Sequence, residues 1–297
     1  MSGRRKFWLA FVGLYMVPII GLIAIIGKHG KNNEFKPQNE FHLDTWVNLP
    51  GPFDINKAVL YLVLATALTI GTVFWISRRM QARPNRVQTA VETLYSLMRD
   101  NIARGNMDER MAKKWFPFLG TIFLFIWWSN LIGYVPLPTN TGEKFHFLGI
   151  DVPGFALFAA TANVSIPLVL ALIVFVAYNV EGVRAKGPIG YLKSLIPQGV
   201  TGGMAVFIFG LEFMSNFMRL ISLSVRLFAN ILAGHLIILF MSGGLAVLLG
   251  AAYVGWLTLP FGVLLFLFEV GLVATLQAFI FATLSAIYLG GAVAESH

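Results

Sequence analysis

The 297-residue chain contains no cysteine, and its charged residues are few. The lack of cysteine excludes disulfides, thiolate metal sites and thiol catalysis. Charged residues make up 12% of the chain, hydrophobic residues make up 57%, and the mean hydropathy is +0.73. A water-soluble domain of this length would not show such values. The composition therefore predicts an all-α, polytopic membrane protein.

The chain also lacks the short motifs that carry common enzyme chemistry. It has no phosphate-binding GxxxxGK[ST] loop, no HExxH, no GxSxG and no cluster of metal ligands. We therefore expect that this chain binds no nucleotide, cofactor or metal and is not an enzyme by itself.

A net charge of +8 would by itself be compatible with nucleic-acid binding. The cations, however, stand in short blocks beside apolar runs, which is the pattern that sets membrane topology. The blocks lie at residues 4–6, 78–86, 113–114 and 184–193. The expected surroundings are therefore a lipid bilayer and not nucleic acid.

Six apolar runs are long enough to cross a bilayer. They lie at Phe7–Gly27, Ala58–Ile76, Phe116–Val135, Phe155–Tyr178, Gly202–Phe240 and Val254–Leu289. The last two exceed one perpendicular crossing, so we expect two long, tilted C-terminal helices that form a hairpin in the membrane. With the basic blocks on the inner side, both termini are cytoplasmic.

Residues 1–56 are expected to be a segment of their own, and residues 57–297 the membrane domain. We favour a retained helix for Phe7–Gly27, because no small-x-small cleavage site follows it, and a cleaved leader is the alternative. Turn-forming residues predict external connections at Lys28–Asn56, Pro136–Gly154 and the Gly-rich link Ser242–Ala252.

The segment from Arg83 to Arg104 is amphipathic. Its apolar residues recur at helical spacing among polar ones. This pattern predicts a helix that lies on the cytoplasmic membrane surface, and a soluble connector helix is the alternative.

The fifth apolar run carries three charged residues, Glu212, Arg219 and Arg226. An arginine at mid-membrane depth costs roughly 2.5 to 3.5 kcal/mol on insertion scales, so such a residue usually has a function. At about 100° per residue, Arg226 shares one helix side with the other two and with Asn230. Small residues such as Ser222 flank it, and they allow another helix to come close. Two simpler roles for Glu212 are an interface residue whose side chain reaches the cytoplasmic surface and a partner of Arg219.

His235 lies beyond Arg226 on the same run, and Glu269 and Gln277 lie on the next one. If the two helices pack antiparallel, Glu269 comes near His235 and Gln277 near Arg226. A carboxylate and an imidazole in a partly wet cleft both titrate in the physiological range, so they can relay protons. Simpler roles remain open: a hydrogen-bonded histidine in a helix interface, and a glutamine that joins two helices.

Residues 222–236, SLSVRLFANILAGHL, strongly resemble the signature of subunit a of F-type ATP synthases. Residues 275–289, TLQAFIFATLSAIYL, are similar to the last helix of that family. Residues 116–136 and 171–197 are similar to its middle helices and cytoplasmic loop. The resemblance covers about residues 57–289.

The resemblance implies a role for each matching residue. Arg226 would be the essential stator arginine that faces the carboxylates of the rotating c-ring. Glu212 would line the cytoplasmic half-channel, and His235 would line the opposite one, where some members have glutamate. Asn230 follows the arginine in the motif, and Gln277 would be its neighbour.

The chain departs from the family pattern at two places. Members usually carry an aspartate near the start of the fourth family helix, where this chain has Asn163. The acidic or histidine residue of the last helix normally sits seven residues before the glutamine, whereas Glu269 precedes Gln277 by eight. One extra residue turns a side chain by about 100°. Asn163, Ser222 and Arg219 are further candidates for half-channel lining.

These features predict the proton-translocating stator subunit of a rotary F-type ATP synthase in a bacterial plasma membrane. Protons would enter near His235 and Glu269, travel on the c-ring and leave near Glu212. The predicted partners are the c-ring and b-type stalk subunits, with the nucleotide chemistry on other subunits. A self-contained proton-coupled transporter or cation channel is the alternative, although the internal repeat that many transporters have is not visible here.

Overall fold

The computed structural model describes residues 45–47, 55–81, 85–147, 150–196, 200, 202–245 and 252–294. The chain divides into two compact units. The first unit comprises Leu43–Ala233 and Glu269–His297, and the second comprises Met1–His42 and Gly234–Phe268. The predicted first span and most of the separate segment 1–56 lie outside the described residues.

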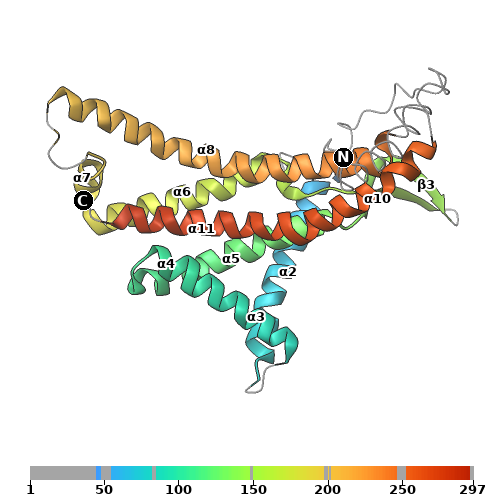
Figure 1. Cartoon of the computed structure of the whole chain (residues 1–297), viewed down its shortest axis with the longest axis horizontal. Helices are drawn as coiled ribbons and strands as arrows, with labels where there is room; N and C mark the ends of the chain where they lie inside the picture. The colour runs from blue at the N-terminus through green and yellow to red at the C-terminus, as the bar shows by residue number, and fades with distance from the viewer. Residues whose placement is uncertain are drawn as a thin grey trace, which may run out of the picture. The chain divides into compact units, whose positions relative to one another are not determined.

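Long helices dominate the described part of the chain (Figure 1). Five of them are long and apolar enough to cross a membrane: Lys57–Arg79 (α2), Glu109–Gly133 (α5), Ser165–Lys186 (α6), Gly203–Leu239 (α8) and Thr258–Val293. The last contains most of α10 (Ala252–Phe268), a π-helical turn η5 (Glu269–Val273) and α11 (Ala274–Val293). The predicted all-α, polytopic class with two long C-terminal helices is confirmed.

Helix α5 packs against both α2 and α11 in the first unit, and α6 also packs against α11. The buried face of α5 is made of large apolar side chains, among them Leu119, Phe123 and Ile126. The buried face of α11 is mostly small, with Ala274, Ala278, Ala282, Ser285 and Ala286. Small residues let neighbouring helices approach closely, so α11 serves as the common packing surface of the unit.

The predicted amphipathic segment is helical, as α3 (Arg86–Ser96), a π-helical turn η2 (Leu97–Ala103) and α4 (Arg104–Asn106). Three of its apolar residues are buried, since Met98, Ile102 and Ala103 are at most 4% exposed, whereas Val87 and Tyr95 are exposed. A side chain at Gly290 of α11 would collide with the main chain of Asn106, so the end of this segment lies directly against α11. The helix was predicted correctly, while its place at the membrane surface stays a prediction.

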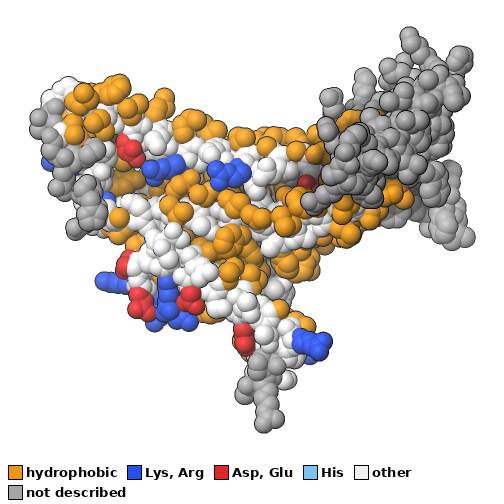
Figure 2. Space-filling view, in the orientation of Figure 1, with side chains coloured by type: hydrophobic (Ala, Val, Ile, Leu, Met, Phe, Trp, Pro, Cys, Tyr) orange, Lys and Arg blue, Asp and Glu red, His pale blue; other side chains and the backbone are white. Residues whose placement is uncertain are grey.

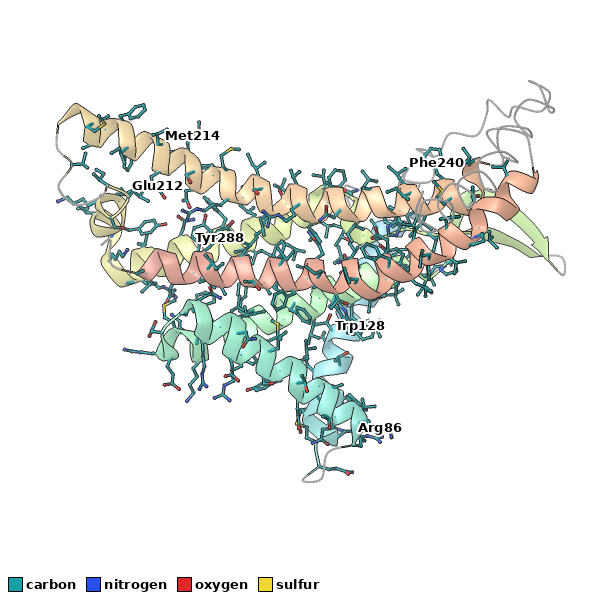
Figure 3. The ribbon with its side chains drawn as sticks, viewed as in Figure 1. Arg86, Trp128, Glu212, Met214, Phe240 and Tyr288 are labelled. Atoms are coloured by element: carbon teal, nitrogen blue, oxygen red, sulfur yellow. The ribbon has the colours of Figure 1, made fainter. Side chains whose placement is uncertain are left out.

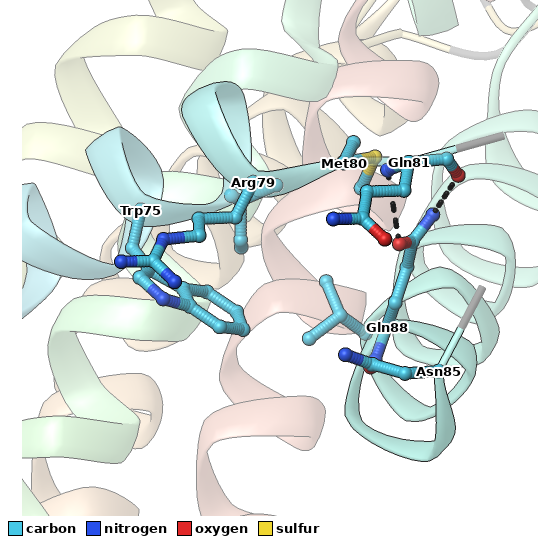
Figure 4. A pocket seen from close by; sticks show the side chains of 8 residues that line it. Trp75, Arg79, Met80, Gln81, Asn85 and Gln88 are labelled. Carbon is cyan, nitrogen blue, oxygen red and sulfur yellow. Dashed lines mark hydrogen bonds between the residues drawn. The ribbon is translucent and has the colours of Figure 1, made fainter. Parts of the chain in front are cut away.

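The side chain of Gln88 links the end of α2 to the first turn of α3 (Figure 4). Its Oε1 accepts the main-chain N–H of Gln81 at 3.1 Å, and its Nε2 donates to the Gln81 carbonyl at 2.9 Å. The Asn85 side chain accepts the N–H of Gln88 at 2.8 Å and caps α3. These bonds fix the direction in which α3 leaves α2.

The region predicted as the second external loop contains an antiparallel hairpin, β3 (Leu137–Phe147) and β4 (Ile150–Ala156). The helix predicted from Phe155 begins only at Ser165, after a short 3-10 turn, η3 (Ala160–Ala162). That predicted start was wrong because Phe155 and Ala156 pair with β3. The Asn163 side chain accepts a hydrogen bond from the Ser165 N–H at 3.0 Å, just where the helix begins. A second antiparallel pair, β1 (Thr45–Val47) and β2 (Ile55–Asn56), lies in the first predicted loop.

The described part of the second unit contains the last turn of α8, a π-helical turn η4 (Phe240–Gly244) and α10. The η4 turn packs against α10. Residues 246–251 of the predicted Gly-rich link lie outside the described residues.

Candidate functional site

Arg226 stands on the exposed face of α8. Its neighbours on that face, Ser222, Ala229 and Ala233, are small and also exposed. The buried face, about 60° to 140° further around the helix, carries Leu223, Leu227 and Ile231. Basic side chains of α8 lie among hydrophobic ones on its surface (Figure 2). Within the described ranges, the Arg226 guanidinium has neither a hydrogen-bond nor an ion-pair partner, so this cation is presented outward and unneutralised.

Glu212 and Arg219, nearer the start of α8, form an ion pair. Arg219 Nη2 donates to Glu212 Oε1 at 3.2 Å, and the two side chains are 37% and 41% exposed. The Arg219 guanidinium also lies 5.5 Å from the centre of the Tyr288 ring on α11. Figure 3 shows Glu212 and Tyr288 on the facing sides of α8 and α11. The predicted pairing of Glu212 with Arg219 is observed, while the place of Glu212 in a half-channel stays a prediction.

A buried polar cluster adjoins this pair and joins three helices. The Tyr178 hydroxyl donates to Asn216 Oδ1 at 2.6 Å, and Asn216 Nδ2 donates to Asn179 Oδ1 at 3.1 Å. The Tyr191 hydroxyl, from α7 (Pro188–Lys193), donates to the same Asn179 oxygen at 2.9 Å. Asn216 follows Glu212 by one helical turn on α8, so the cluster continues the polar path inward from the ion pair.

Sequence reasoning missed this cluster. A signal was present in Asn216, which lies between Glu212 and Arg219 at helical spacing. Burial raises the pKa of the Tyr191 hydroxyl, an effect that Arg219 opposes and Glu212 reinforces. The hydroxyl therefore stays protonated at neutral pH and remains a hydrogen-bond donor.

Gln277 on α11 contacts α8 one turn beyond the arginine. Asn230 Nδ2 donates to Gln277 Oε1 at 3.0 Å, and Gln277 is only 3% exposed. The predicted antiparallel pairing of the two helices therefore brings Gln277 to Asn230, the residue one turn from Arg226. This hydrogen bond supports the simpler role that the sequence left open for Gln277, a glutamine that joins two helices.

Glu269 begins the π-helical turn η5 and is bonded to the end of α5. The Tyr134 hydroxyl donates to Glu269 Oε2 at 3.1 Å. Tyr134 is 3% exposed, whereas Glu269 is only partly buried. Sequence reasoning missed Tyr134, because its partner Glu269 lies 135 positions away in the chain. Glu269 and Tyr134 therefore lie near the start of α11, whereas Tyr288, beside the Glu212 and Arg219 pair, lies near its end.

Comparison with known proteins places this arrangement in a family. The family model described as ATP synthase A chain matches residues 59–290. The chain belongs to that family. It is 34% identical to ATP synthase subunit a of Myxococcus xanthus over 84% of this chain and 78% of the relative. It is 34% identical to that of a Nocardioides species over 82% and 83%, and 35% identical to that of Helicobacter pylori over 78% and 88%.

The η5 turn lies between Glu269 and Gln277, which are eight residues apart in this chain where seven are expected for the ATP synthase A chain family. A π turn closes with i→i+5 hydrogen bonds, so it takes up about one residue more than an α turn. Because η5 begins at Glu269, the eight residues to Gln277 advance around the axis about as seven α-helical residues do. The angular offset of about 100° that the sequence suggested is thereby largely removed.

The second departure from the family pattern concerns Asn163. Its side chain caps the start of α6, and the residue is partly buried. A different amide, Asn130 on α5, is 0% exposed and accepts from Thr161 Oγ1 at 2.8 Å. Asn130 Nδ2 also reaches the Ala274 carbonyl of α11 at 3.4 Å. Sequence reasoning missed Asn130, whose only signal is an amide inside an apolar span.

His235 is 4% exposed and belongs to the second unit, whereas Glu269 belongs to the first. The predicted proximity of the two therefore stays a prediction. Within the first unit, the structure brings together Glu212 with Arg219 and Asn230 with Gln277, and it leaves Arg226 and Ser222 on the exposed face of α8.

Proposed function

We propose that this chain is the stator subunit of a rotary, proton-translocating ATP synthase, and that Arg226 faces the carboxylates of a rotating c-ring. The observation that carries the proposal is the exposed guanidinium of Arg226, which no described residue neutralises. Membership of the ATP synthase A chain family supports the same function.

The position of Arg226 calls for an acidic partner from another polypeptide. A charge held against hydrocarbon costs several kcal/mol unless it is paired or hydrated. In this chain small residues flank Arg226 on one side, and α8 packs against its own unit through the adjacent buried face. Ser222, Ala229 and Ala233 would let a partner helix approach closely enough for its carboxylate to meet the arginine.

Two polar groups lie on opposite sides of Arg226 along the chain's long helices. The Glu212 group lies on α8, roughly 21 Å before Arg226 at 1.5 Å per residue. The Glu269 and Tyr134 pair lies at the other end of α11. We assign the first to an exit path on the cytoplasmic side and the second, with His235, to an entry path on the outer side.

Arg226 has two tasks in this scheme. Its charge favours the ionised form of the approaching ring carboxylate, and its fixed position prevents protons from passing directly between the two paths. Each elementary charge that crosses 100 mV releases about 2.3 kcal/mol. Because the paths do not meet, that free energy is released only as the ring turns.

The assignment also sets the surroundings of the chain. The expected partners are the c-ring and b-type stalk subunits in a bacterial plasma membrane, with both termini of this chain in the cytoplasm. ATP is then made or hydrolysed on other subunits. The chain itself is a membrane subunit and not the catalytic one.

The absence of cysteine from the chain allows a direct test. Ser222→Cys and Ser224→Cys place one thiol on the exposed and the buried face of the same helix turn. In assembled complexes that carry single cysteines along the outer helix of the c-subunit, we expect disulfide cross-links from residue 222 and none from residue 224. Equal cross-linking from both, or none from either, would contradict the proposed face. A self-contained transporter would also purify without c-subunits.

A further inference from the structure

An apolar cavity of about 290 Å³ lies between α2, α3 with η2, and α5. Its walls include Ile76 and Met80 of α2, Leu94 and Met98 of α3 and η2, and Gly120 of α5. All of these residues belong to the first unit. The cavity follows α5 from Phe116 to Leu124, so it runs from the start of a membrane span into its apolar part.

A second, polar cavity of about 340 Å³ adjoins the apolar one. The two share Tyr95 and Phe116, whose rings meet edge to face at 4.9 Å. The polar cavity is otherwise lined by Arg99, Arg104, Glu109, Ala112 and Lys113. Charged side chains gather over α4 and the adjoining segments (Figure 2).

The charges in the polar cavity do not cancel. Arg104 is paired with Asp100 at 3.2 Å and with Glu109 at 3.0 Å. Arg99 and Lys113 have no acidic partner in the part of the chain that the structure describes. The cavity therefore presents two cations to an occupant, beside the entrance of the apolar cavity.

The other end of the apolar cavity is also basic. A smaller cavity of about 110 Å³ shares Ile76, Met80 and Val91 with it and is lined by Arg79 (Figure 4). The hydrogen bonds between Gln88 and Gln81 hold this corner in place. The apolar cavity thus has cationic side chains at both ends and hydrocarbon walls between them.

We propose that this combined site binds one anionic phospholipid, with its phosphate at Arg99 and Lys113 and an acyl chain in the apolar cavity. Basic pockets at the membrane surface between helices suit acidic headgroups. A zwitterionic lipid would bring its own cation beside Arg99 and Lys113 and leave their charge uncompensated, and a free phosphate would leave the hydrocarbon walls empty. A partner helix, about 10 Å across, is too wide for a cavity of this volume.

The bound lipid holds the amphipathic segment to the membrane domain. Its acyl chain contacts α2, α3 and α5 together, and its phosphate bridges η2 to the start of α5. This role is independent of the rotary function proposed above, since neither Arg226 nor either proton path contributes to the site.

The experiment uses the intact complex in nanodiscs of phosphatidylcholine with an increasing share of phosphatidylglycerol, and native mass spectrometry counts the retained lipid. The double variant Arg99→Gln/Lys113→Gln should raise the share needed for half-occupancy by about 30-fold, the loss expected for two cations near an anionic lipid. The control Arg184→Gln/Lys193→Gln removes the same charge from exposed positions outside the cavities and should leave retention unchanged.

Gly120→Leu tests the apolar cavity separately, because it leaves every charged side chain unchanged. A Cβ at Gly120 would meet no neighbouring atom within 4 Å, and Gly120 lines the apolar cavity, so a leucine there would extend into the space that the acyl chain needs. It should displace the phosphatidylglycerol while the subunit content of the complex stays intact. Unchanged retention in both variants would overturn the proposal. So would equal displacement by inorganic phosphate, or a cross-link from Gly120→Cys to a neighbouring polypeptide.

Discussion

Two arginines of α8, seven residues apart, have opposite surroundings. Arg219 is paired with Glu212 at 3.2 Å and lies 5.5 Å from the Tyr288 ring. Arg226 is exposed on the same helix and has no such partner among the described residues. The first cation is satisfied by its own chain, and the second is available to another one. The residue type is the same, so the difference lies in what the neighbouring positions supply.

This contrast is the reason that we assign the proposed role beside the c-ring to Arg226 and not to Arg219. A cation already neutralised by its own chain attracts a passing carboxylate weakly. A cation on a face of small and apolar residues attracts it strongly, because the low dielectric increases the Coulomb energy.

The largest effect is expected from Arg226→Ala. In membrane vesicles it should lower ATP synthesis and ATP-driven proton pumping by at least about 100-fold, as loss of a fixed charge-stabilising group does in a dry site. Arg219→Ala removes the same side chain but breaks only an exposed pair worth about 0 to 1 kcal/mol, so we expect a loss of a few-fold. Both complexes should contain all subunits. Similar losses in the two variants would remove the distinction between the arginines.

A smaller but still large effect should follow when Arg226 is given a partner in its own chain. Ser222 lies four residues before Arg226 on the exposed face, where a glutamate would pair with it. Ser222→Glu should therefore lower proton pumping by about 10-fold, because the ring carboxylate then competes with a local one. Ser215→Glu places a glutamate four residues before Arg219, which is already paired, and should cost little. A greater loss from Ser215→Glu would contradict this reading.

Glu269→Gln should slow proton flux less than Arg226→Ala. A group that is the sole proton carrier typically accounts for about 100-fold or more. Here Tyr134 is bonded to the same carboxylate and His235 is assigned to the same path, so about a 10-fold loss is expected. The measurement is the initial rate of pumping in vesicles with matched amounts of complex. A loss equal to that of Arg226→Ala would mean that Glu269 has no substitute.

Much of this architecture was predictable from local pattern. The membrane spans follow from apolar runs, and the strip of small residues beside Arg226 follows from a spacing of about 100° per residue. The pairing of Glu212 with Arg219 was also foreseen, because seven residues correspond to nearly two turns of one helix. Each of these features depends on residues close together in the sequence.

The features that were missed depend on contacts between distant segments. Tyr134 is hydrogen-bonded to Glu269, 135 positions later in the chain. Asn130 is hydrogen-bonded to Thr161 and to the carbonyl of Ala274. The π turn at Glu269 changes the facing of a side chain, yet the sequence there reads as an ordinary apolar helix. The hairpin β3–β4 was read as a loop because its prolines and glycines are typical of turns.

The smallest of these effects should come from Tyr134→Phe, which removes one hydroxyl and keeps the buried ring. A hydrogen bond of this kind contributes about 1 kcal/mol, so proton flux should fall by about 5-fold if Tyr134 positions Glu269. Tyr95→Phe removes a hydroxyl from a more exposed tyrosine, 47% exposed, and is the matched control. The combination of Tyr134→Phe with Glu269→Gln should be no slower than Glu269→Gln alone, because the hydroxyl acts through that carboxylate. A further loss in the double variant would show that Tyr134 carries protons itself.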